Sequence, residues 1–273
     1  MNRCQGKRNR RMKLTLNNVE IFASTGGRDF DPSSGPVVLF VHGSGQSHLG
    51  FMLQHRFFAN RGFQCITPDM PGHGLSKGEA LTTVEAMADW YAQFMQALGI
   101  PKAILVGHSM GGLIELELAS RYPDLVAKAA FISTALAIPV NDALINLAAT
   151  NESAAIAAMM DWGHGTAGHI HDHTMPGTSH MLYGSRLMAG NAPGTLHKDL
   201  VACNAYDNGP TAAQSVTCPT LTVVCGQDRM TPRKTGLALQ AALGGELVEI
   251  AQSGHMSITE HPFDVNKALR AFF

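Results

Sequence analysis

The stretch from residue 104 to residue 112 limits what this chain can fold into more than any other part of the sequence. It begins with apolar, partly β-branched residues typical of a buried strand, and residues 113–121 after it are typical of a helix. Between the two lies Gly-x-Ser-x-Gly, with Ser109 at its centre. Gly107 and Gly111 are needed because a Cβ there would collide with a tightened backbone. The pattern predicts a sharp turn that holds the serine hydroxyl above the edge of a sheet.

Apolar runs of strand length recur along the chain and alternate with segments of helical periodicity. Besides the strand that begins at residue 104, strands are expected at residues 37–41, 65–67, 129–133, 221–225 and 247–250, and an antiparallel pair at 14–22 with its turn at Asn17 and Asn18. Helices are expected from a capping box at Thr82 and Glu85 to Gly99, and over residues 262–273. This order predicts an α/β fold with a mostly parallel central sheet and helices on both faces.

One segment, residues 135–213, interrupts the alternation because it contains no convincing strand and is rich in Met, Ala, Gly and His. Helices are expected within it at residues 142–160 and 195–206. We interpret the segment as a helical lid inserted over the carboxyl ends of the strands. The core then comprises residues 14–134 and 214–273, which makes one domain with an insertion.

The composition excludes several classes of protein. With 45% hydrophobic residues, 15% charged residues and a net charge of −1, the chain is typical of a globular protein rather than a disordered one. No overall field favours nucleic acid or an anionic membrane. Residues 1–13 are an exception because they carry six basic residues and no acidic one. We expect them to be a disordered extension, with a binding arm as the alternative.

The five cysteines are odd in number and show no Cys-x-x-Cys spacing, which indicates neither a zinc site nor a redox pair. The sequence shows no signal peptide and no apolar run long enough to span a membrane. We therefore expect a cytoplasmic monomer or homodimer that acts on a small molecule. No cofactor, metal, nucleic acid or membrane partner is expected.

A serine at its ordinary pKa is a poor nucleophile and needs a base, which in turn needs a group that orients it. Asp228 follows the strand expected at 221–225, and His255 lies in the loop after the strand expected at 247–250. These loops belong to the same edge of a parallel sheet as Ser109, so the three side chains are expected to meet. As alternatives, Asp228 could cap the next helix, and His255 could have a structural role.

A carbonyl group under attack develops negative charge, which needs two preorganised hydrogen-bond donors. The amide of Met110 lies at the start of the helix after Ser109, where unpaired N–H groups favour an anion. The amide of Ser44 is the second candidate, because the glycine on each side of it lets the backbone approach a substrate closely. We therefore expect Ser44 and Met110 to form an oxyanion hole.

Five stretches carry a resemblance to a known family: His42-Gly-Ser-Gly45, Asp69-Met-Pro-Gly-His-Gly-Leu-Ser76, Gly107-His-Ser-Met-Gly-Gly112, Gly226-Gln-Asp-Arg-Met-Thr-Pro232 and Gly254-His-Met256. In order and spacing they resemble the α/β-hydrolase superfamily. The resemblance implies the α/β-hydrolase fold, with Ser109, Asp228 and His255 as nucleophile, orienting acid and base. It implies less about the substrate, because this fold hosts many chemistries.

The resemblance also separates branches of the superfamily. Haloalkane dehalogenases and epoxide hydrolases carry an aspartate where this chain has Ser109. The meta-cleavage C–C hydrolases usually have Asn in place of His108 and Trp in place of Met256, and haloperoxidases usually have an aromatic residue in place of Ser44. A serine hydrolase of carboxylic esters or lactones is therefore the leading expectation. The alternatives are a C–C hydrolase, a perhydrolase, a non-catalytic ligand receptor and a scaffold with a vestigial site.

The insertion provides the only indication of the substrate. Its flexible apolar side chains suit irregular ligands, so we expect a small, largely apolar acyl substrate. The pocket is expected to include Met159, Trp162 and Met181 of the insertion, with His42, His108 and Met256 beside the catalytic loops. His42 and His73 are also expected to hydrogen-bond the backbone and shape the site.

Five histidines between residues 164 and 180 include a His-x-His-x-His pattern, which can bind a metal, but we interpret them as solvated or pH-responsive.

Overall fold

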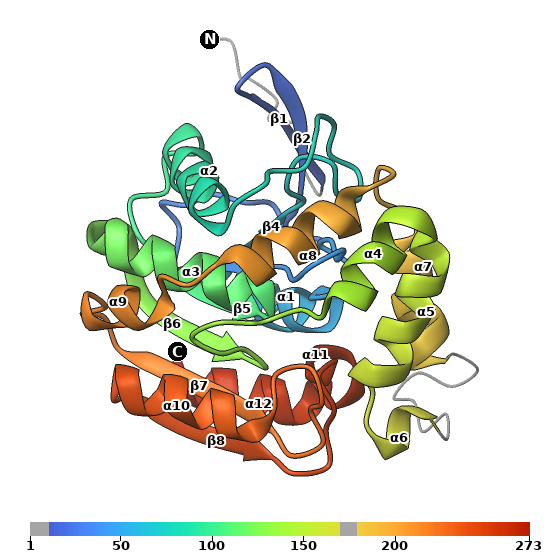
Figure 1. The fold of residues 1–273 in the computed structure, drawn as a ribbon. Helices are drawn as coiled ribbons and strands as arrows, with labels where there is room; N and C mark the ends of the chain where they lie inside the picture. The colour runs from blue at the N-terminus through green and yellow to red at the C-terminus, as the bar shows by residue number, and fades with distance from the viewer. Residues whose placement is uncertain (1–10, 170–178) are drawn as a thin grey trace, which may run out of the picture.

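The computed structural model describes residues 11–169 and 179–273, and its eight strands form one sheet in the order β1-β2-β4-β3-β5-β6-β7-β8 (Figure 1). The strands are β1 (Arg11–Leu16), β2 (Val19–Ser24), β3 (Val37–Val41), β4 (Gln64–Pro68), β5 (Ala103–His108), β6 (Val126–Ile132), β7 (Thr220–Cys225) and β8 (Glu246–Ile250). The pairs β1–β2 and β2–β4 are antiparallel, and all other neighbours are parallel. The predicted α/β fold with a mostly parallel sheet is confirmed.

Helices cover both faces of the sheet and create one apolar core on each side. In β3, Leu39 and Val41 pack into the first core while Val38 and Phe40 pack into the second, as the alternation of a strand requires. The first face is covered by α2 (Val84–Ala97), α3 (Met110–Arg121) and α10 (Arg233–Leu243); the second is covered by α1 (Met52–Ala59), α11 (Ser257–Glu260) and α12 (Pro262–Phe272). The short 3₁₀ helix η1 (Pro123–Leu125) joins α3 to β6. Burial on both faces explains why the strands have continuous apolar runs.

In the part that the structure describes, the segment between β6 and β7 contains helices joined by loops and no strand. It contains α4 (Asp142–Thr150), α5 (Glu152–Gly163), α6 (Thr166–His169), α7 (His180–Met188), α8 (Thr195–Ala205) and α9 (Gly209–Gln214). Side chains of α4, α5, α7 and α8 form a third apolar core, and α8 also contacts α3 (Figure 1). The helix predicted at 142–160 is instead two helices, because Asn151 leaves helical geometry and its side chain accepts the amide of Ala154 at the start of α5.

Two local predictions at the N-terminal half are wrong. Residues 11–13, predicted as part of a disordered extension, belong to β1, where Lys13 forms an ion pair with Glu20 of β2 at 2.9 Å. The cap of α2 is Thr83 rather than Thr82, since the Thr83 hydroxyl accepts the Ala86 amide. Residues 1–10 lie outside the described part of the chain. No helix in the described ranges has the length and apolar character needed to cross a bilayer.

Candidate active site

Ser109 lies on a tight turn between the carboxyl end of β5 and the start of α3. Its backbone has φ 56° and ψ −122°, a combination that residues with a side chain rarely adopt. A Cβ on Gly107 would overlap the backbone of Gly111, and a Cβ on Gly111 would overlap the carbonyl of Val41 in β3. The two glycines of the sequence pattern are therefore required for steric reasons.

His255 and Asp228 come together from the loops that follow β8 and β7. His255 Nδ1 lies 2.9 Å from Asp228 Oδ2, so Nδ1–H donates to the carboxylate and Nε2 remains the basic ring nitrogen. The Thr231 hydroxyl also donates to Oδ2 at 2.7 Å, and the amides of Met230 and Thr231 donate to Oδ1 at 2.8 Å each. The carboxylate is thus held on both oxygens, and it holds the imidazole in one orientation.

Asp228 favours its ionised form although it is buried. Burial raises its pKa, but His255 and the hydrogen bonds from Thr231 outweigh that effect and hold the pKa below its ordinary value. An ionised carboxylate here stabilises positive charge on the ring of His255, which a base acquires when it takes a proton. The helix-cap alternative does not describe this residue, because α10 has Pro232 as its N-cap and no side-chain cap hydrogen bond.

His108 contacts the backbone of His255. It was predicted to line the pocket, and it does not. It is fully buried, and its Nε2–H donates to the carbonyl oxygen of His255 over 2.8 Å. Burial, followed by repulsion from a charged His255, lowers the pKa of His108 to about 3, so its ring stays neutral. The residue before the serine therefore positions the backbone of the histidine loop.

A buried carboxylate that the sequence analysis did not identify holds the other side of the same loop. Glu260 Oε2 accepts the Gly254 amide at 2.9 Å, and Glu260 Oε1 accepts the Gly165 amide at 2.7 Å. Burial raises the pKa of Glu260, against the two hydrogen bonds that favour its charged form. Because Gly165 belongs to the helical insertion, Glu260 joins the insertion to the loop of His255. Nothing in the local sequence marks this role.

Ser109 and His255 line the same cavity, which has a volume of about 150 Å³ and is called here the catalytic pocket. Four of the predicted residues line it as well: Ser44, Met159, Trp162 and Met256. Much of the remaining wall is apolar and was not predicted: Ile138, Val140, Leu144, Leu200, Cys203 and Met230. Most of these additional residues come from the insertion, so the helices between β6 and β7 decide the shape of the pocket.

Two further residues predicted for the pocket, His42 and Met181, lie outside it. His42 is fully buried, with Nδ1–H donating to the Gly43 carbonyl at 3.1 Å and Nε2 accepting the Met70 amide at 3.2 Å. Burial lowers its pKa to about 4, so its ring is neutral and ties two loops together. Met181 is partly buried against the third apolar core, because α7 turns it toward the other helices of the insertion.

The amides expected to form an oxyanion hole are both unpaired. Within residues 11–169 and 179–273, neither the Ser44 amide nor the Met110 amide has a hydrogen-bond acceptor. The Ser44 hydroxyl is already engaged, since it lies 3.4 Å from the sulfur of Met110 and 3.3 Å from the sulfur of Cys203. The backbone N–H groups, rather than this hydroxyl, are therefore the donors left for a ligand.

A buried ion pair fixes the loop that carries Ser44. Asp199 of α8 accepts the Gly45 amide at 2.7 Å and His73 Nε2–H at 2.9 Å on the same Oδ2 atom. His73 Nδ1–H donates to the Pro71 carbonyl at 3.0 Å. Burial opposes charge on His73, but Asp199 and these hydrogen bonds outweigh it and raise the pKa. Sequence analysis missed Asp199, although an acid between the apolar residues of a helix was a usable signal.

The histidines of the insertion do not gather into a metal site in the described residues, where no group of three or more His, Cys, Asp and Glu side chains could hold an ion. His164 contacts the carbonyl of Met160 at 2.7 Å, and His169 contacts that of Asp161 at 3.1 Å. His171 and His173 lie outside the described residues, so the interpretation of the His-x-His-x-His pattern as solvated or pH-responsive histidines stays a prediction.

The sheet order, the serine on its strand-to-helix turn and the histidine–aspartate pair at the same edge define the α/β-hydrolase class. A family model described as alpha/beta hydrolase fold matches residues 36–262, and the chain belongs to this family.

Among curated relatives, a bifunctional esterase/perhydrolase of Acinetobacter calcoaceticus is 36% identical over 124 residues, which are 44% of this chain and 42% of that protein. The matches span less than half the length of the curated relatives. An enol-lactonase from Burkholderia xenovorans is 21% identical with a TM-score of 0.84, over 96% of this chain and 99% of that one. An esterase from Thermogutta terrifontis is 22% identical with a TM-score of 0.82, over 96% and 97%. At these identities, the structural likeness shows the shared fold.

Proposed function

We propose that this protein is a serine hydrolase that cleaves a carboxylic ester or lactone of a small, largely apolar substrate through an acyl-enzyme. The observation that carries the proposal is that Ser109 and the oriented His255 open into one cavity. Relatives and structural neighbours named as esterases and lactonases support the same choice.

In the first half of the proposed reaction, His255 Nε2 takes the proton of the Ser109 hydroxyl as the oxygen attacks the substrate carbonyl. The ionised Asp228 stabilises the imidazolium that forms. The unpaired amides of Ser44 and Met110 donate to the oxyanion. His255 then gives its proton to the departing alkoxide, and the acyl group remains on Ser109.

In the second half, a water molecule loses a proton to His255 and attacks the acyl-enzyme. The oxyanion forms again at the same amides, and collapse returns the proton to Ser109 and releases the acid. For a lactone, the leaving alkoxide is part of the same molecule, so the product is a hydroxy acid. The steps use only side chains, backbone amides and water.

The pocket supports a substrate of limited size. Its volume of about 150 Å³ is below the usual range for ligand sites, and its walls combine apolar side chains of the insertion with the polar groups of Ser109 and His255. Among the polar residues lining it, Arg229 extends from the loop after β7 and donates to the carbonyl of Asp161 at 2.6 Å. We expect short acyl groups to fit better than long ones.

The test is hydrolysis of p-nitrophenyl esters from acetate to decanoate, with the Ser109→Ala variant as control. We expect an initial burst of p-nitrophenol equal to the enzyme concentration, an optimum at short acyl chains, and no turnover in the variant. A folded protein without activity on any ester or lactone would contradict the proposal.

Perhydrolysis is a second candidate activity, because the Acinetobacter relative is named as both esterase and perhydrolase. The same acyl-enzyme would be attacked by hydrogen peroxide instead of water, which yields a peracid and free Ser109. Peracid formed from ethyl acetate and hydrogen peroxide, and absent with Ser109→Ala, would support this activity. An enzyme that gives only acetic acid under these conditions lacks it.

A further inference from the structure

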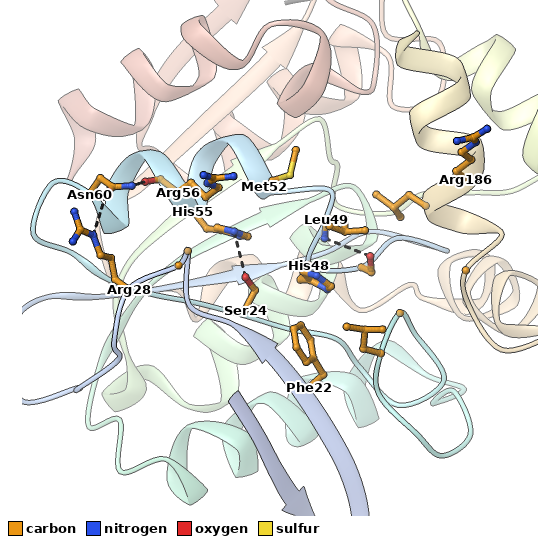
Figure 2. A pocket seen from close by; sticks show the side chains of 17 residues that line it. Phe22, Ser24, Arg28, His48, Leu49, Met52, His55, Arg56, Asn60 and Arg186 are labelled. Carbon is orange, nitrogen blue, oxygen red and sulfur yellow. Dashed lines mark hydrogen bonds between the residues drawn. The ribbon is translucent and has the colours of Figure 1, made fainter. Parts of the chain in front are cut away.

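A second cavity is lined by residues 47–49, which follow Ser44 in the same loop, and it shares no lining residue with the catalytic pocket. Its volume is about 740 Å³, within the range of small-molecule sites. The walls come from β2, α1, the loops at residues 47–49 and 74–75, and α7 of the insertion (Figure 2). We call it the arginine pocket, after Arg28, Arg56 and Arg186 in its lining.

The lining of this pocket is cationic in a chain whose net charge is −1. It contains three arginines, and no aspartate or glutamate. Within the described residues, none of the three arginines forms an ion pair. Unpaired guanidinium groups beside a cavity are donors available to a carboxylate or phosphate group.

Two of the arginines are held near each other at one end of the pocket. Arg28 Nε donates to Asn60 Oδ1 at 2.9 Å, and the Asn60 amide group donates to the backbone carbonyl of Arg56 at 2.8 Å. Figure 2 shows Arg28, Arg56 and Asn60 together, with Arg186 at the far end beyond Leu49. Asn60 thus fixes Arg28 against α1, the helix that carries Arg56, and both arginines line this end of the pocket.

The floor of the pocket contains a buried histidine with one nitrogen available. His48 is 9% exposed, and its Nδ1–H donates to the Asp69 carboxylate at 2.9 Å. Its Nε2 makes no hydrogen bond to any residue that the structure describes. By contrast, both ring nitrogens of His55 are engaged, by Ser24 at 3.3 Å and Thr67 at 3.2 Å. The Nε2 atom of His48 is therefore available to a ligand, and the Asp69 carboxylate holds the ring in place.

The wall between the two cationic ends is apolar. Phe22, Leu49, Met52, Leu75 and Leu187 line it, and the ring of Phe22 lies 4.7 Å from that of His48. Leu49 and Leu75 are exposed, at 36% and 51%, although large aliphatic side chains usually avoid water. An apolar chain lying along this wall would cover both.

From these contacts we propose that the arginine pocket is a second binding site for a small amphiphile with one carboxylate or phosphate group. The anionic group lies between Arg28 and Arg56, and the apolar chain runs past Leu49 toward α7. The proposal does not depend on the proposed esterase activity, because no residue of the catalytic pocket contributes. Since α7 belongs to the insertion and α1 to the core, a bound ligand contacts both parts of the fold.

The test is calorimetric titration of the Ser109→Ala chain, which cannot turn over an ester, with octanoate, octyl phosphate and inorganic phosphate. We expect saturable binding of one of the octyl compounds, tighter than that of inorganic phosphate because the chain buries apolar surface. The tighter of octanoate and octyl phosphate identifies the anionic group. The Arg28→Ala/Arg56→Ala double substitution should weaken binding at least tenfold.

The matched control is Arg270→Ala, which removes an exposed arginine of α12 that does not line the pocket. It should leave binding unchanged, and thermal unfolding should show that each variant is folded. Absence of saturable binding would overturn the proposal, as would equal weakening by the double substitution and by Arg270→Ala. Equal affinity for inorganic phosphate and octyl phosphate would overturn the role of the apolar wall.

Discussion

The catalytic pocket and the arginine pocket are both lined by the loop at residues 44–49, but their polar groups are held very differently. In the catalytic pocket, Asp228 accepts from four donors and His255 is oriented through it. In the arginine pocket, Arg28, Arg56 and Arg186 are exposed and form no ion pair with any residue that the structure describes.

This difference reflects two physical demands. Bond cleavage needs donors and acceptors fixed before the transition state forms, because reorganising them during the reaction raises the barrier. Binding an anion needs charge and reach, which a long and flexible guanidinium side chain supplies at an exposed position. The first pocket has buried supports in His108, Glu260, Asp199 and His73. In the second pocket His48 has the buried carboxylate of Asp69 as its partner, whereas the three arginines are exposed.

The largest effect is expected at the reacting groups. Ser109→Ala or His255→Ala should each lower kcat for ester hydrolysis by about 10⁴ to 10⁶-fold, because the two act as one unit. The double variant should lose little more than either single one. Steady-state kinetics on p-nitrophenyl acetate measure this, and multiplicative losses in the double variant would show that the residues act separately.

Asp228→Asn tests whether the carboxylate orients His255 and stabilises its positively charged form. An amide can offer a donor to His255 Nδ1 and so stabilise the wrong tautomer, and we expect a loss of about 10⁴-fold in kcat with little change in KM. Thr231→Val is the graded companion, since it removes one donor to Asp228 and leaves the carboxylate in place. A kcat near that of the parent in Asp228→Asn would contradict the assigned role.

Asp199→Ala tests whether the buried support extends to the oxyanion loop. It leaves the Gly45 amide without an acceptor and His73 without its counter-charge, so we expect a loss of about 3 kcal/mol in the free energy of unfolding. We also expect kcat to fall about tenfold, with KM changing less, because Ser44 adjoins Gly45. Asp199→Asn, which keeps an acceptor, should restore part of kcat. Urea denaturation and steady-state kinetics measure both.

The stability of the protein is also expected to depend on pH. Burial lowers the pKa of His42 to about 4 and of His55 and His108 to about 3, whereas the unfolded chain takes up protons on them near pH 6.5. Below pH 6.5 the unfolded state therefore binds more protons than the folded state. The free energy of unfolding decreases as the pH is lowered, by roughly 1.4 kcal/mol per pH unit for each such histidine. The raised pKa of His73 acts in the opposite sense, adding stability at low pH that is lost as pH rises through it.

Urea denaturation between pH 7 and pH 5 measures this dependence. His55→Asn removes one of the three neutral histidines. His55 lines the arginine pocket, so this change leaves the catalytic pocket intact. Its stability should vary less steeply with pH than that of the parent. An unchanged slope would show that His55 is not held neutral in the folded protein.

The smallest effect is expected from the exposed cations. Arg28→Ala/Arg56→Ala should leave kcat and KM for a short ester within about twofold of the parent, because both residues are exposed and neither lines the catalytic pocket. Thermal unfolding should also be nearly unchanged. A large loss of activity without added ligand would show that the two pockets are not independent.

Much of the fold was predictable because the signals are local. The apolar runs at 37–41 and 221–225 coincide with β3 and β7, and Asn17 and Asn18 adopt positive φ at the predicted hairpin turn. Strand boundaries follow from periodicity and turn chemistry over a few residues. The insertion was harder, since a single residue, Asn151, decides whether 142–160 is one helix or two.

The sequence by itself determined the strand-to-helix turn at Ser109 and the chain order of Ser109, Asp228 and His255. Such motifs are readable because each depends on the conformation of a short peptide and on the shared edge of parallel strands. Only the tertiary structure decided that His108 supports His255 instead of lining the pocket, that Asp199 holds the Ser44 loop, and that three distant arginines surround one cavity. The first two roles depend on contacts between residues more than a hundred positions apart, and the third on how separate elements meet, which local pattern does not encode.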